Sequence, residues 1–156
     1  MLGGQRPYGG QPHLSFPSRM DRAEALIRLG SARVGYLVTV RPSGRPHIVP
    51  VTHALVENFL VTMIDHKPKT TDRLQRLINI EANPTATLMA DHYSEDWKAL
   101  WWVRVDGEAS IHDGDRIWEE SAAALNAKYR QYDENSPRGP AVVISIDSVT
   151  SWESTP

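Results

Sequence analysis

The stretch RVGYLVTVRPSGRPHIVPVTHALVENFLVTMI, residues 33–64, decides the fold class. Three segments in it are rich in β-branched and aromatic residues and are predicted strands: 33–41, 45–56 and 59–64. Arg41–Gly44 has Pro and Gly where a type I turn requires them, and Glu57-Asn58 predicts a second tight turn. Strands joined by such short turns predict an antiparallel meander.

The rest of the chain adds three helices and three more strands. Capping residues and apolar periodicity predict helices over about 21–30, over about 71–82, and from Asp113 or Asp115 to about 129. Further strands are predicted at 85–91, 99–112 and 141–153. Six strands without a βαβ alternation predict a mainly-β fold with short helices, a six-stranded antiparallel barrel rather than a doubly wound sheet.

The domain organisation is simple. Residues 1–19 are rich in Gly, Pro, Gln and Ser without a hydrophobic period, and we expect a flexible N-terminal extension there. Residues 20–156 fit one domain that is large enough to bury a single core.

Composition excludes several classes of function. The formal net charge of −2 gives no basis for a nucleic-acid or anionic-membrane partner, because such binding needs excess positive charge. The chain has no cysteine, which excludes disulfides, thiolate catalysis and zinc-thiolate sites. No apolar run approaches the ~20 residues of a membrane span, and no secretory h-region is present at the start. We therefore expect a cytoplasmic protein.

The segment before the second helix is the strongest candidate for binding an anion. A helix N-terminus offers unpaired N–H groups and a partial positive charge. The cationic and hydroxyl side chains that would converge there are Lys67, Lys69, Thr70, Arg73 and Arg76. They form either a phosphate clamp or an ordinary solvated basic loop.

A proline marks a second candidate. Pro50 precedes Val51 and Thr52 within a predicted strand, and proline removes a donor from the hydrogen-bond ladder, so it occurs at edges or bulges. Such an interruption lets a flat ligand lie against backbone groups, or it simply marks an edge strand. Adjacent Trp101 and Trp102 must face opposite sides of a strand, so one of them faces solvent, a ligand or a partner chain.

Motifs for other chemistry are missing. His47 and His53 lack a third ligand at a recognisable spacing, so no metal site is expected. The sequence has no GxSxG elbow, P-loop or GxGxxG, which disfavours nucleophilic hydrolysis and Rossmann-type nucleotide binding.

Several segments together resemble one family. These are Asp65-His66-Lys67-Pro68-Lys69-Thr70-Thr71, Arg76-Leu77-Ile78-Asn79-Ile80, Asn83-Pro84, Asp96-Trp97 and Leu100-Trp101-Trp102-Val103-Arg104-Val105-Asp106-Gly107. Over about residues 20–152 they are similar to pyridoxamine-phosphate-oxidase-like proteins, in particular to the actinobacterial deazaflavin-dependent branch. The resemblance implies an FMN-binding split-barrel type of fold and a homodimer with two cofactor sites at its interface.

The resemblance also implies site residues. Lys67, Lys69, Thr70 and Arg73 or Arg76 would hold the cofactor phosphate. The ring would lie against Pro50, Val51 and Thr52, and an exposed tryptophan (Trp102) with Trp152 would come from the second subunit. The expected cofactor is the deazaflavin coenzyme F420, with FMN as the alternative. No pyridoxal-phosphate clamp is evident, which argues against vitamin B6 chemistry.

The expected function is that of an oxidoreductase that transfers hydride from reduced F420 to a small organic substrate. The alternatives are an FMN-dependent oxidase or reductase and a non-catalytic protein that binds a flavin or tetrapyrrole. No catalytic residue is assigned, because Tyr93, His53 or a bound water could equally donate a proton.

Overall fold

The computed structural model describes residues 19–65 and 74–155. The predicted extension 1–19 therefore lies almost wholly outside the described residues. The elements are α1 (Arg22–Ser31), β1 (Gly35–Val40), β2 (Pro46–Val51), β3 (Ala54–Val56), β4 (Phe59–Met63), α2 (Gln75–Ala82), β5 (Thr85–His92), β6 (Trp101–His112), α3 (Arg116–Lys128) and β7 (Ala141–Glu153), with the 3₁₀ turns Trp97–Ala99 and Arg130–Tyr132.

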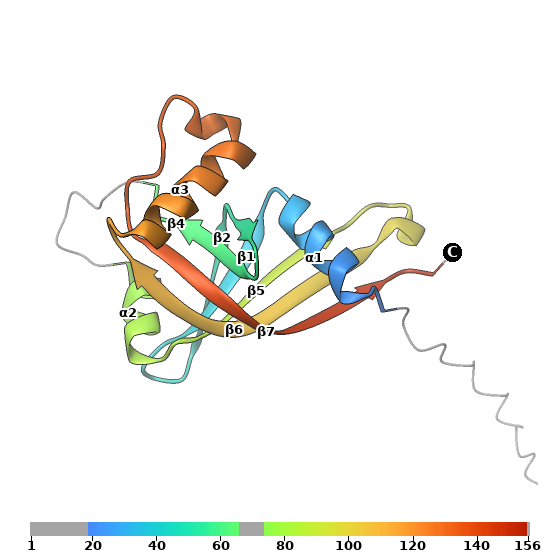
Figure 1. Ribbon diagram of the computed structural model, residues 1–156. Coiled ribbons are helices and arrows are strands. Elements are labelled where there is room, and N and C mark those ends of the chain that lie inside the picture. The colour runs from blue at the N-terminus through green and yellow to red at the C-terminus, as the bar shows by residue number, and fades with distance from the viewer. Residues whose placement is uncertain (1–18, 66–73, 156) are drawn as a thin grey trace, which may run out of the picture.

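The strands form one antiparallel sheet in the order β2-β1-β5-β6-β7-β4-β3. The predicted mainly-β antiparallel fold with short helices is confirmed, with seven strands in place of six. Figure 1 shows β6 and β7 as a long curved ribbon, with α3 near one end and α1 toward the other. β2 and β3 are the two edge strands of this curved, open sheet, which forms a half-barrel.

The extra strand arises because the predicted strand 45–56 breaks at Thr52-His53. The backbone there bonds to α3 and its C-terminal end instead of to a neighbouring strand. The His53 N–H donates to the Tyr129 hydroxyl at 3.1 Å, and the His53 carbonyl accepts from Lys128 Nζ at 2.7 Å. The predicted meander is therefore wrong in part: β1–β2 and β3–β4 are separate hairpins.

Local signals fix the turns and the helix starts. Gly44 has φ 85° and donates its N–H to the Arg41 carbonyl at 2.8 Å, in the turn predicted between β1 and β2. Asp21 caps α1 by accepting from the Glu24 N–H at 2.8 Å, and Asp115 caps α3 in the same way. The second helix starts at Gln75, later than predicted, because Leu74 has extended backbone angles.

The core has two parts. The larger part fills the concave side of the sheet under α1 and α2 and contains fully buried leucines from α1, β1 and β5. The smaller part lies under α3, with Leu125, Tyr129 and Tyr132 against β3, β4 and β7. The C-terminal end of α3 is therefore held next to the β2–β3 junction.

Candidate functional site

A hollow of about 270 Å³ opens beside the end of β2. Its lining comes from β2 and the junction after it (Pro50, Val51 and Thr52), from the end of β4 and the residues after it (Thr62, Met63 and Asp65), from Val34 before β1, and from Arg76 in the first turn of α2. These segments meet there because the sheet curves and brings its two edges toward each other.

A second hollow of about 400 Å³ continues from the first. Both are lined by Val34, Thr52 and Asp65, so they are parts of one depression, which we call the Thr52 cleft. The remaining lining of the second hollow comes from Arg33 and from the chain after α3: Tyr129, Gln131 and Tyr132.

A short hydrogen-bond chain crosses the floor of the Thr52 cleft. The Tyr132 hydroxyl donates to Asp65 Oδ1 at 2.5 Å, so the Thr52 hydroxyl is the donor in its 2.8 Å bond to Tyr132. Burial, together with the bond to the Asp65 carboxylate, raises the pKa of Tyr132 to about 12. Tyr132 therefore keeps its proton at neutral pH and orients the Asp65 carboxylate.

Cations stand at both ends of the cleft. At the α2 end, burial lowers the pKa of Arg76, and the charge of Asp65 opposes this effect. The Arg76 guanidinium makes no hydrogen bond to another residue in 19–65 or 74–155. At the other end, the Arg33 guanidinium lies 4.6 Å from the centre of the Tyr129 ring and donates to the Lys128 carbonyl at 3.0 Å.

Lys128 holds the backbone at this second end of the cleft in place. Its Nζ donates to the carbonyls of Ala32 and His53, each at 2.7 Å, and lies 5.0 Å from the centre of the Tyr129 ring. Burial, and then the charge of Arg33, lowers the pKa of Lys128 to about 8. The lysine fixes the junction between β2 and β3 rather than facing a ligand.

The structure brings four of the residues predicted from the sequence together: Pro50, Val51, Thr52 and Arg76 all line the first hollow. Four others, Lys67, Lys69, Thr70 and Arg73, lie outside the described residues. Trp102 of β6 and Trp152 of β7 are paired across the ladder between these strands and do not line the Thr52 cleft within the described chain, so their assignment to a second subunit stays a prediction.

Two candidate proton donors do not line the cleft. His53 is fully buried, and Tyr93 is 65% exposed on a different loop. Sequence reasoning missed Asp65, Tyr132 and Arg33. Their contacts join residues 67 to 95 positions apart, and no local pattern marks such pairs.

The described residues 19–65 and 74–155 contain no group of three or more potential ligands that could hold a metal ion. Within the same ranges, each helix is too short or too polar to span a lipid bilayer.

Comparisons with known proteins agree on the fold. The family model described as pyridoxamine 5'-phosphate oxidase matches residues 19–153. No curated protein matches the sequence. Among solved structures, a conserved hypothetical protein from Mycobacterium tuberculosis is 20% identical with a TM-score of 0.70, over 86% of this chain and 85% of that chain.

An FAD-binding protein from Mesorhizobium loti is 18% identical with a TM-score of 0.68, over 86% of this chain and 93% of that one. A heme-binding protein from Mycobacterium smegmatis is 22% identical with a TM-score of 0.63, over 81% of this chain and 51% of that one. These similarities confirm the split-barrel type of fold that the resemblance implied.

Proposed function

The chain belongs to the pyridoxamine 5'-phosphate oxidase family, and from this premise we propose that it is an oxidoreductase that binds a flavin-type cofactor in the Thr52 cleft. One observation carries the proposal: the cleft joins a half-buried arginine, Arg76, to the wall formed by Pro50, Val51 and Thr52. An FAD-binding protein has a similar fold, which supports this choice of ligand.

Arg76 is suited to the phosphate of such a cofactor. A guanidinium presents a rigid fork of donors and binds phosphate oxygens through charge-assisted hydrogen bonds. Its partial burial strengthens those bonds, because less water competes for them. We propose that Lys67, Lys69, Thr70 and Arg73 add further donors from the segment that precedes α2.

The wall of the cleft is suited to a flat ring. β2 is an edge strand, so alternate backbone groups on its outer side have no partner strand among the described residues and can bond to the polar edge of a ring. Pro50 lacks an N–H and offers an apolar surface in their midst. These groups orient the ring, while Tyr132 and Asp65 hold a proton at the floor of the cleft.

A bound flavin-type cofactor supplies hydride transfer, and the protein supplies position and exclusion of water. We propose that the cofactor is F420, as the resemblance of the basic segment implies, with FMN as the alternative, and that the acceptor is a small organic molecule. We also propose a homodimer in which Trp102 and Trp152 of one subunit cover the cleft of the other.

Fluorescence titration with F420, FMN and FAD tests this assignment. Micromolar binding of F420 supports the full proposal, and binding of FMN alone rejects the choice of F420. The Arg76→Ala variant should weaken binding by at least tenfold, since a charge-assisted bond contributes about 1.5–3 kcal/mol. Lys98→Ala is the matched control, because Lys98 is an exposed cation on the Trp97–Ala99 turn.

Replacing Lys67 and Lys69 together by alanine should cost roughly 2–4 kcal/mol of cofactor binding, if each lysine makes one charge-assisted contact. The same titration measures it. Unchanged affinity would show that the basic segment is only a solvated loop.

A second candidate is a non-catalytic carrier of a flavin or tetrapyrrole. The described cleft offers a single acid-base pair, Tyr132 and Asp65, and a heme-binding protein has a similar fold. Turnover assays with the reduced cofactor against quinones, enones and tetrapyrroles distinguish the two, because a carrier binds its ligand without oxidising the cofactor.

A further inference from the structure

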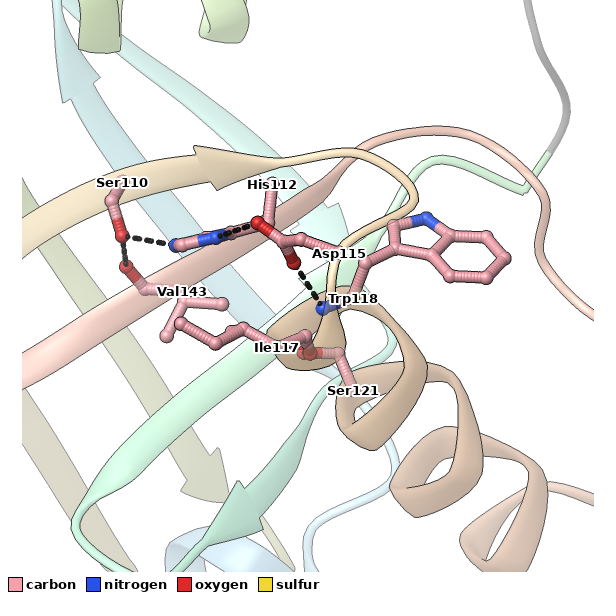
Figure 2. Close-up of polar contacts among 7 residues, drawn as sticks. All are labelled: Ser110, His112, Asp115, Ile117, Trp118, Ser121 and Val143. Carbon is pink, nitrogen blue, oxygen red and sulfur yellow. Dashed lines mark hydrogen bonds and ion pairs between the residues drawn. The ribbon is translucent and has the colours of Figure 1, made fainter.

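A serine, a histidine and an aspartate form a continuous hydrogen-bond chain at the opposite end of β6 from Trp101. The Ser110 hydroxyl lies 2.9 Å from His112 Nε2, and His112 Nδ1 lies 2.7 Å from Asp115 Oδ2. Figure 2 shows the three side chains in line, with the imidazole between the hydroxyl and the carboxylate. The three residues of this hydrogen-bond chain are close in sequence. Ser110 and His112 lie on one face of β6, and Asp115 caps α3 directly after that strand.

The protonation state of this hydrogen-bond chain follows from that of Asp115. Its Oδ1 accepts from the Trp118 N–H at 2.8 Å. That bond and the bond from His112 lower the pKa of the carboxyl, so it is ionised and can only accept. His112 therefore carries a proton on Nδ1, and in the neutral imidazole Nε2 accepts a hydrogen bond from the Ser110 hydroxyl. The competing contact, from Ser110 to the Val143 carbonyl, is much longer at 3.5 Å.

An apolar hollow of about 90 Å³ lies one strand away from the serine, which is not itself among its lining residues. Val143 pairs directly with Ser110 across the β6–β7 ladder, and its side chain lines this hollow together with Phe59 and Ile117. A cavity of about 150 Å³ holds benzene, so this one admits an aliphatic chain of about three or four carbons.

The Ile111 N–H is a backbone donor without a partner strand among the described residues. β5 begins at Thr85, opposite Glu108, and Ala109 then donates its N–H to the Pro84 carbonyl. Because strand N–H groups alternate in direction, the N–H of Ile111 points to the same edge, where the described residues place no paired strand. It is the N–H of the residue that follows the serine, the position that supplies one oxyanion donor in α/β-hydrolases with a nucleophile elbow.

We propose that Ser110, His112 and Asp115 form a nucleophilic triad that hydrolyses esters with short aliphatic acyl groups, a second activity separate from the Thr52 cleft. The sequence has no GxSxG elbow, but triads are recognised by geometry and roles rather than by sequence position. In the first step the Ser110 oxygen attacks the ester carbonyl carbon, and the bond from that carbon to the alcohol oxygen breaks.

The serine proton moves to His112 Nε2 and from there to the leaving alcohol. Water then attacks the acyl-serine, and His112 takes one water proton and returns a proton to Ser110 as the carboxylic acid leaves. Nothing is oxidised or reduced in either step.

The test uses the full chain with p-nitrophenyl butyrate and with a biotinylated alkyl fluorophosphonate. We expect release of p-nitrophenol above the uncatalysed rate and one covalent adduct on Ser110 by intact mass and peptide mapping. Ser110→Ala should abolish both signals. Ser148→Ala, which removes an exposed serine of β7, should retain both.

Asp115→Ser separates positioning of the histidine from the structural role of the cap. Serine is a good N-cap, so α3 should keep its stability, whereas loss of the carboxylate should lower the rate of hydrolysis by about a hundredfold or more. Circular dichroism and thermal unfolding verify the fold of each variant. Equal hydrolysis by wild type and Ser110→Ala, or a wild-type protein that the fluorophosphonate leaves unmodified, overturns the proposal.

Discussion

The buried imidazole of His53 should make the stability of this protein depend on pH. His53 is fully buried at the β2–β3 junction, where Nε2 donates to the Leu29 carbonyl at 2.7 Å. Nδ1 makes no hydrogen bond among the described residues. Burial is the main cause that lowers the pKa of His53 to about 4, and the charge of Lys128 lowers this pKa further. Backbone hydrogen bonds to Leu29 and Val51 oppose the shift.

The sign and size of the effect follow from linkage. Between pH 6.5 and about 4 the unfolded chain binds a proton at this histidine and the folded chain does not, so stability is full above pH 6.5 and falls as the pH drops. At 1.36 kcal/mol per pH unit, the whole window corresponds to about 3 kcal/mol. About 2 kcal/mol of it should be lost by pH 5.

Urea unfolding of wild type and His53→Gln at several pH values between 7.5 and 4.5 measures this loss. Glutamine can still donate to the Leu29 carbonyl but does not titrate, so the difference between the two stability curves isolates His53. NMR provides a second measurement, because the ring resonances of His53 should show no titration down to about pH 5. Parallel stability curves for the two proteins, with a His53 ring that titrates near pH 6.5, would refute the reasoning.

Two further changes have clear expected effects. Gly107→Ala should destabilise the fold by about 2 kcal/mol or more. An added Cβ would lie 1.8 Å from the Ser145 carbonyl oxygen, at the bulge of the β6–β7 ladder. Urea unfolding measures the loss of stability. Asp21→Ala should lower the free energy of unfolding by about 1 kcal/mol in the same assay, because the Glu24 N–H loses its hydrogen-bond acceptor. Asp21→Ser should recover most of this stability. A loss of stability that serine does not restore would argue against the cap.

Part of the candidate site could be predicted from the sequence. Proline within a strand marks a break in the ladder, and this rule led to Pro50 and its two neighbours, which line the Thr52 cleft. The periodicity of the second helix led to Arg76, which faces them. The other predicted phosphate ligands lie in 66–73 and stay predictions.

The residues that complete the cleft could not be predicted from the sequence. Tyr132 lies 67 residues after Asp65, and the two meet only because α3 packs over the smaller core and returns the chain to the β2–β3 junction. The chain of Ser110, His112 and Asp115 is close in sequence, but its alignment depends on where β6 ends and α3 begins.

The sequence by itself determined the class of the fold, the β1–β2 turn, the Asp21 cap of α1 and the bounds of the last strand, because each depends on side-chain alternation or on hydrogen bonds within a few residues. For α3 it left Asp113 and Asp115 open as caps, and the structure shows Asp115. The tertiary structure decided that the second predicted strand divides between the two edges of the sheet. That division depends on bonds from Tyr129 and Lys128 to His53, made across 75 or more residues, and it creates the cleft.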